Sequence, residues 1–175
     1  FPTRFAAVAD AFDITWTLHR SDKRRRMAIM VSKQAHCLYD ILAHHESGEW
    51  PADIVQVISN HEDHRHLAER HGLPFAYIPV TPDTKATAEA QQIELLQKAG
   101  TDVVVLARYM QILSPAFVQA FPTKIINIHH SFLPAFAGGR PYHAAHERGV
   151  KIIGATAHYV TAELDEGPII EQDVI

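Results

Sequence analysis

The segment Met27-Ala28-Ile29-Met30-Val31 is a continuous apolar run, the pattern of a strand that is covered on both faces of a parallel sheet. The segment Asp102-Val103-Val104-Val105-Leu106, apolar from Val103 onward, is a second predicted strand. Around these two, apolar runs alternate with stretches of helical periodicity. Further strands are predicted at 53–58, 75–80, 124–129, 151–160 and 168–174, and helices at 36–47, 64–71, 84–99, 115–120 and 141–148. The alternation predicts an α/β fold with a Rossmann-like, doubly wound, mainly parallel sheet.

The N-terminal part of the chain has a different pattern. Phe5, Val8 and Phe12 fall at helical spacing, and apolar residues from Ile14 to Leu18 then alternate with polar ones. This pattern predicts a short helix followed by a short strand. So short a segment cannot bury a core of its own. Residues 1–20 are therefore expected either to pack on something else or to be the remnant of an upstream domain, and residues 21–175 to form the main domain.

The composition is ordinary for a globular protein, with 47% hydrophobic and 21% charged residues over 175 positions. The net charge of -4 gives no general attraction to nucleic acid, and the basic run at 23–26 fits a solvated linker. There is no apolar run long enough for a bilayer and no signal-peptide pattern. A single cysteine, Cys37, allows no disulfide within the chain. We expect a cytoplasmic protein, and, because it does not begin with Met, a piece of a longer chain.

Polar side chains gather where the predicted strand 124–129 ends. Asn127 and His129 are two positions apart, so they project from the same face of a strand. An amide and an imidazole side by side are two hydrogen-bond donors aimed at one spot, which suits a developing oxyanion. The alternative is a capped strand end with a structural histidine.

A second polar segment is the loop Thr161–Pro168, which follows the predicted strand that contains His158. Glu163, Asp165 and Glu166 lie there beside a Gly-Pro turn, and a solvated loop is the simplest interpretation. If the loop folds back toward Asn127 and His129, one carboxylate becomes a candidate base for acyl transfer.

The motifs Asn127-Ile-His-His-Ser-Phe-Leu-Pro134 and His158-Tyr-Val-Thr-Ala-Glu-Leu-Asp-Glu-Gly-Pro168 together resemble the signature of the folate-dependent formyltransferase fold, over about residues 26–175. The resemblance implies that Asn127, His129 and Asp165 are catalytic. It also implies that the stretch 106–114 binds the pterin ring through its backbone. The substrate-binding residues expected from it are Arg108, Tyr109, Met110, Gln111, Ile112, Leu113, His130, Ser131, His158, Thr161, Leu164 and Gly167. Folate is then the substrate, and no cofactor is expected.

The loop after the first strand separates two branches of this family. Members that transfer formyl to glycinamide ribonucleotide carry glycines there, which let backbone N–H groups converge on a phosphate. Residues 31–37 contain no glycine, and His130 stands where those members usually have proline. Residues 32–37, the pair His129-His130 and residues 149–157 resemble instead the branch that hydrolyses 10-formyltetrahydrofolate to formate and tetrahydrofolate, which supplies formate for purine biosynthesis and balances the one-carbon pool. Formyl transfer and a non-catalytic folate-binding module stay open as alternatives.

The hydrolytic branch typically has an N-terminal ACT-type regulatory domain, and residues 1–20 resemble the end of one. The resemblance implies a homo-oligomer with a possible amino-acid effector on that domain. It also implies a C-terminal helix that this sequence does not contain.

Other candidate sites carry less weight. The 13 histidines have no Cys pairs or HExxH pattern beside them, so we expect no metal site. His36 and Cys37 are adjacent on a predicted helix and do not face each other, which disfavours a nucleophile–base pair. The first strand is not followed by GxGxxG, which disfavours dinucleotide binding.

Overall fold

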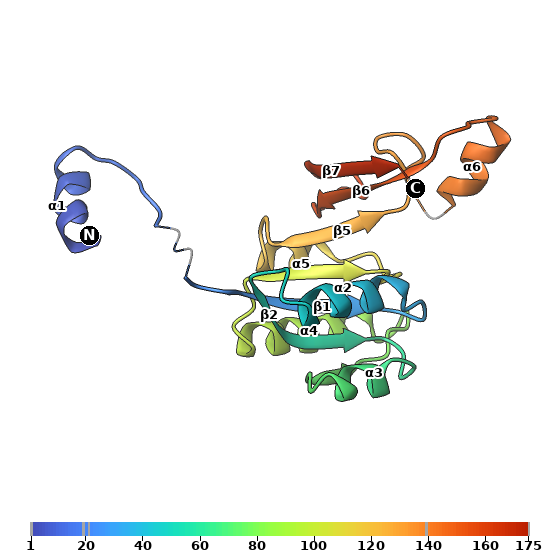
Figure 1. The fold of residues 1–175 in the computed structure, drawn as a ribbon, viewed down its shortest axis with the longest axis horizontal. Helices are drawn as coiled ribbons and strands as arrows, with labels where there is room; N and C mark the ends of the chain where they lie inside the picture. The colour runs from blue at the N-terminus through green and yellow to red at the C-terminus, as the bar shows by residue number, and fades with distance from the viewer. Residues whose placement is uncertain (1, 19, 21, 139, 175) are drawn as a thin grey trace.

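The computed structural model describes residues 2–18, 20, 22–138 and 140–174. Its centre is a seven-stranded sheet in the order β3-β2-β1-β4-β5-β6-β7 (Figure 1). The strands are β1 (Arg25–Val31), β2 (Ala52–Ser59), β3 (Phe75–Tyr77), β4 (Val103–Ala107), β5 (Ile125–His129), β6 (Gly154–Tyr159) and β7 (Ile169–Val174). The strands from β3 to β5 are parallel, whereas β6 and β7 run antiparallel to their neighbours. The predicted mainly parallel α/β sheet is confirmed.

Helices cover both faces of the parallel part. Met30, Val104 and Ile125 point to one face, where Phe117 and Leu96 of α5 (Pro115–Ala120) and α4 (Lys85–Lys98) complete the core. The opposite face buries side chains from β1 and β2 against α2 (His36–Glu46) and α3 (Arg65–Arg70). Consecutive residues of β1 thus enter two different cores, which is why its sequence is apolar without interruption. The sheet is therefore doubly wound, with helices packed on both of its faces.

Most predicted elements are present, with shifted ends. β3 stops at Tyr77 rather than at residue 80, because Pro79 has no N–H to continue the ladder. β6 begins at Gly154, three residues later than predicted. α6 (Pro141–Glu147) lies between β5 and β6 in the sequence.

The N-terminal segment forms a helix, α1 (Pro2–Ala11), which stands apart from the sheet in Figure 1. The predicted strand at 14–18 is wrong, since these residues have no regular structure. Alternation alone does not make a strand, because backbone N–H and C=O groups need a neighbouring strand to pair with, and the described part of the chain offers none there. That this segment ends an ACT-type domain stays a prediction. No helix among the described residues is long and apolar enough to cross a membrane.

The sheet register brings the polar strand ends together. Leu106 in β4 pairs with Asn127 in β5, and Asn127 pairs with His158 in the antiparallel β6. The loop that follows β6 therefore starts beside the amino end of β5, where the Val160 N–H donates to the Ile125 carbonyl, and turns back toward the carboxyl end of this strand. Arg108, directly after β4, has φ 60, and Asp165 in the loop has φ 57. Both residues have the left-handed backbone conformation, which residues other than Gly, Asn and Asp rarely adopt.

Gly167 closes this loop against the sheet. A Cβ at this position would lie 1.6 Å from the carbonyl oxygen of Tyr159, and backbone atoms cannot turn away from it. We expect Gly167→Ala to lower the free energy of unfolding by about 1–3 kcal/mol or more, as overpacking does. Urea denaturation measures the change, and the exposed neighbour Glu166→Ala is the control. Equal stabilities of the two variants would contradict this account of the loop.

Candidate active site

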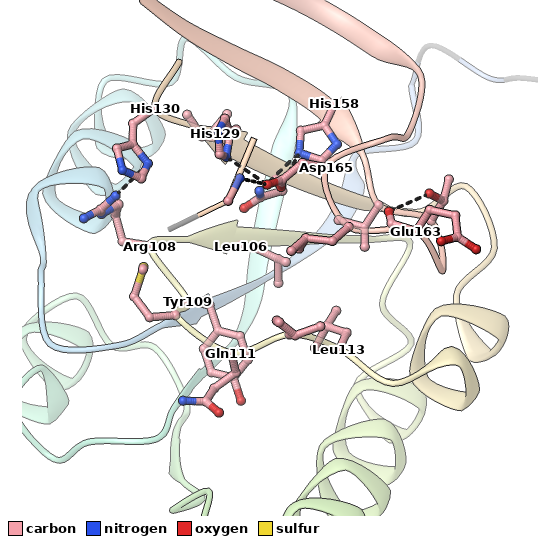
Figure 2. A pocket seen from close by; sticks show the side chains of 18 of the residues that line it. Leu106, Arg108, Tyr109, Gln111, Leu113, His129, His130, His158, Glu163 and Asp165 are labelled. Atoms are coloured by element: carbon pink, nitrogen blue, oxygen red, sulfur yellow. Dashed lines mark hydrogen bonds and ion pairs between the residues drawn. The ribbon is translucent and has the colours of Figure 1, made fainter. Parts of the chain in front are cut away.

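A cleft with an empty volume of about 980 Å³, part of it open to solvent, lies at the carboxyl ends of β4 and β5. Ligands of open α/β sheets bind at this edge of the sheet. The segment after β4 forms one wall and the loop after β6 another (Figure 2). Its lining residues are Leu106, Arg108, Tyr109, Met110, Gln111, Ile112, Leu113, Asn127, Ile128, His129, His130, Gly138, His158, Val160, Thr161, Ala162, Glu163, Leu164 and Asp165.

Asn127 and His129 come from the same face of β5, as the spacing predicted, and both line the cleft. The Nδ2 atom of Asn127 lies 3.2 Å from Nε2 of His158, whose Nδ1 lies 3.1 Å from the carbonyl oxygen of Tyr159. The carbonyl can only accept, so His158 Nδ1–H donates to it and Nε2 accepts from the Asn127 amide. One of the two Asn127 N–H groups is thereby fixed by His158, and the other is left to bind elsewhere.

His158 is 2% exposed, and this burial lowers its pKa, although the backbone of Tyr159 and the nearby Asp165 carboxylate act in the opposite direction. A lowered histidine pKa favours the neutral ring at neutral pH. Only the neutral ring has an unprotonated nitrogen for Asn127. The electrostatics and the hydrogen bonding therefore agree on the same state of His158.

Asp165 reaches into the cleft from the loop after β6. Its side chain is 7% exposed, its Oδ2 lies 3.5 Å from Nδ1 of His129, and its Oδ1 lies 3.8 Å from Nε2 of His158. The backbone N–H of Gly138 donates to Oδ2 at 3.0 Å. Figure 2 shows the three side chains pointing toward one another. The solvated-loop interpretation holds for Glu163 and Glu166, which are exposed, but not for Asp165.

His129 has an oxygen beside each ring nitrogen. Its Nε2 lies 3.2 Å from the carbonyl oxygen of Phe136, and its Nδ1 faces Asp165. A carbonyl can only accept, so His129 Nε2–H donates to Phe136. Nδ1 lies 3.5 Å from the Asp165 carboxylate, within the distance of an ion pair.

Arg108 links three loops at the side of the cleft. Its Nε and Nη2 donate to Oε1 of Gln34 at 3.1 and 2.7 Å, and its Nη1 lies 3.1 Å from Nδ1 of His130. Burial and the Arg108 cation lower the pKa of His130, so His130 is the acceptor in this contact. The bridge joins the loop after β1 to the loop after β5.

The segment after β4 presents a mixed surface. Tyr109 and Leu113 are buried, and burial raises the pKa of Tyr109 to about 12. Met110 and Ile112 are 54% and 64% exposed, and both line the cleft. Exposed apolar side chains at the rim of a concave site suit a flat, partly apolar ligand.

The structure brings nearly all predicted site residues to this cleft. Ser131 and Gly167 lie outside its lining. The Ser131 hydroxyl donates to the carbonyl oxygens of Ala135 and Phe136, and Gly167 packs against Tyr159, so both residues shape the surrounding loops rather than the cleft surface. Sequence reasoning missed Gly138, which orients Asp165. The glycines at 138 and 139 were the available signal, since glycines mark close approaches of the backbone.

No group of three or more His, Cys, Asp or Glu side chains within the described ranges is placed to hold a metal ion. The pair His36 and Cys37 lies at the start of α2 and does not line the cleft. Burial raises the pKa of the Cys37 thiol, which makes it less reactive.

Several known proteins are similar in sequence to most of this chain. The formyltetrahydrofolate deformylase of Bacillus subtilis is 56% identical over 170 residues, which are 97% of this chain and 57% of that protein. The deformylase of Escherichia coli K12 is 54% identical over 152 residues, which are 87% of this chain and 54% of that protein. This chain thus spans somewhat more than half the length of these relatives.

Solved structures give the same picture. The formyltetrahydrofolate deformylase of Burkholderia mallei is 52% identical, with a TM-score of 0.91 over 99% of this chain and 62% of that chain. Glycinamide ribonucleotide transformylase 1 of Symbiobacterium toebii is 34% identical, with a TM-score of 0.82 over 91% of this chain and 77% of that chain. The sequence profile described as formyl transferase matches residues 25–175, from the first residue of β1 onward. Since that span contains the whole sheet and every residue of the cleft, the chain belongs to the formyl transferase family.

Proposed function

We propose that this chain is the catalytic part of an enzyme that hydrolyses 10-formyltetrahydrofolate to formate and tetrahydrofolate. The observation that carries the proposal is the convergence of the Asn127 amide, the His129 ring and the buried Asp165 carboxylate at one edge of the cleft. The names of the relatives that are 52–56% identical support the substrate.

The formyl group on N10 is amide-like, so its carbonyl has to be made electrophilic. Asn127 and His129 donate to the formyl oxygen, which stabilises the oxyanion as it develops. Asp165 removes a proton from the attacking water, directly or through a second water. The bond from the water oxygen to the formyl carbon forms, the bond from that carbon to N10 breaks, and N10 takes up the proton. His158 holds Asn127, and Gly138 holds the carboxylate.

The pterin ring binds along residues 109–113, where the Met110 and Ile112 side chains are exposed at the cleft. Backbone groups of this segment read the edge of the ring. Thr161 and Leu164 lie on the opposite wall and complete the site.

The Arg108 bridge supports water as the formyl acceptor. The loop after β1 has no glycine, and its Gln34 side chain is hydrogen-bonded to Arg108, which also contacts His130. Side chains therefore cross the place where a phosphate-binding loop would need free backbone N–H groups. The lower identity of 34% to the transformylase agrees with this. Burying a carboxylate costs free energy. That Asp165 is nevertheless buried beside Asn127 and His129 favours a catalytic site over a binding module without turnover.

The properties of the whole protein follow from the same proposal. Residues 1–20 end an ACT-type domain that binds an amino-acid effector, and the protein is a cytoplasmic homo-oligomer. It uses no cofactor, and it has no nucleic-acid or membrane partner. Its formate supplies purine biosynthesis and its turnover balances the one-carbon pool.

Asn127→Ala removes one donor to the oxyanion. We expect kcat for formate release to fall about a hundredfold or more, with the fold intact by circular dichroism, because loss of one such donor costs about 2.7–4 kcal/mol. Glu94→Ala, at an exposed position on α4, is the control. Near-normal turnover of Asn127→Ala would exclude the donor role.

His158 should make the stability of the protein depend on pH. Its pKa is lowered in the folded state, so the unfolded chain binds this proton at higher pH than the folded chain. The free energy of unfolding should therefore decrease as the pH falls below about 6.5, the usual histidine value. His158→Gln keeps an acceptor for Asn127 and does not titrate, so it should lose less stability than the wild type between about pH 7.5 and about pH 5.5. Urea denaturation at both pH values measures this, and equal losses would refute it.

The choice of acceptor can be measured directly. With 10-formyltetrahydrofolate and an excess of glycinamide ribonucleotide, the full-length protein should release formate at the same rate as without the amine, and formylated ribonucleotide should not accumulate. Mass spectrometry of both products gives the ratio. Efficient formyl transfer would overturn the hydrolytic assignment and favour the transferase alternative.

A further inference from the structure

Residues 109–114, which form the folate side of the cleft, are held from behind by side chains of α4. We propose that Lys85, Glu89 and Gln92 are positioning residues that set the backbone of this segment for pterin binding. The inference rests on the proposed function, and it assigns part of the substrate affinity to a helix that does not itself line the cleft.

The three side chains lie on one face of α4, because their spacing of four and three residues returns to the same side of a helix. Gln92 is fully buried, and its Nε2 donates to the Tyr109 hydroxyl at 2.9 Å. Glu89 is 6% exposed, and its Oε1 accepts from the backbone N–H of Ser114 at 3.1 Å. Each end of the segment is thus tied to a buried side chain of the helix.

Lys85 holds the middle of the segment. Its ammonium group donates to the backbone carbonyl of Ile112 and lies 3.0 Å from Oε1 of Glu89. The ion pair compensates the buried Glu89 carboxylate, which would otherwise be costly. Lys85, Glu89 and the backbone of 112–114 therefore form one connected network, in which removal of either charge leaves the other without its partner.

Glu89 and Gln92 are polar residues at buried positions of α4. The rest of the α4 face that packs on the sheet contributes apolar side chains such as Ala88 and Leu96. Apolar residues at 89 and 92 would pack equally well in the core. They would leave the Ser114 N–H and the Tyr109 hydroxyl without these partners. Gln92 also leaves its own Oε1 without a hydrogen-bond partner in the described structure. A core that keeps polar residues at such a cost is typical of a functional site.

The network determines which backbone groups remain for a ligand. The Ile112 carbonyl is turned to Lys85, and the Met110 N–H donates to the Ser32 hydroxyl at 3.0 Å. The N–H groups of Ile112 and Leu113 have no hydrogen-bond partner among the described residues, and both residues line the cleft. Fixing one set of groups on α4 and on Ser32, directly after β1, leaves another set in a defined position for the edge of the pterin ring.

The test compares Glu89→Leu with Glu89→Gln in the full-length protein. Glu89→Leu removes the acceptor and the partner of Lys85, so the KM for 10-formyltetrahydrofolate and the Kd for tetrahydrofolate should each rise about tenfold, the effect of about one hydrogen bond. The kcat should stay within about twofold, because the catalytic groups are untouched. Glu89→Gln keeps an acceptor for Ser114 and should recover part of the affinity. Glu94→Leu, an exposed acid on the same helix, should behave like the wild type.

Two results would overturn the inference: an unchanged Kd in Glu89→Leu, or a fall in kcat without a change in KM. If Glu89→Leu does not fold, Glu89→Gln and Lys85→Met decide, and unchanged tetrahydrofolate affinity in both overturns it. Hydrogen exchange at the bonded N–H groups of Met110 and Ser114 is measured without folate and should accelerate in the variants, so it tests the positioning role separately. Absence of formate release by the wild type would instead refute the proposed function.

Discussion

The buried carboxylate of Asp165 is the constraint on which the rest of the site depends. A carboxylate that is 7% exposed needs partners, and this one accepts from the Gly138 N–H at 3.0 Å and lies 3.5 Å from Nδ1 of His129. These contacts tie the loop after β6 to the end of β5 and to the loop around Gly138. Beside them, His158 is held by the Tyr159 carbonyl and accepts from the amide of Asn127. The Asp165 side chain thus joins the loop after β6 to the end of β5 and to the loop that follows β5.

The fold makes this convergence possible through its change of strand direction. The parallel strands β4 and β5 bring their carboxyl ends to one edge, and the antiparallel β6 then returns along β5 so that His158 faces Asn127. Because β6 is antiparallel, it ends beside the start of β5, and the loop that follows turns back to bring Asp165 to His129. On the other side of the cleft, α4 holds the segment after β4 by polar contacts rather than by apolar packing. The catalytic wall and the binding wall are therefore fixed by different parts of the fold.

Much of this was predictable from residue pattern, and the failures have physical causes. The apolar run 27–31 predicted a strand buried on both faces, and the two-residue spacing of Asn127 and His129 predicted their common face. The strand at 14–18 failed because pairing partners cannot be read from a strand's own sequence. The contact of Gly138 with Asp165 was missed for the same reason, and so were the contacts that Glu89 and its neighbours on α4 make with the segment after β4. Both depend on contacts between distant segments. Local pattern gives elements and faces, whereas long-range partners require coordinates.

The central claim is that Asp165 activates the water that attacks the formyl group. Asp165→Asn keeps the shape of the side chain and an acceptor for Gly138 but removes the charge, and Glu166→Gln makes the same change at an exposed neighbour. The rate of formate release from 10-formyltetrahydrofolate by the full-length protein decides the question. We expect kcat to fall about a hundredfold or more in Asp165→Asn, with tetrahydrofolate affinity retained and Glu166→Gln unchanged. A turnover of Asp165→Asn close to that of the wild type would contradict the account.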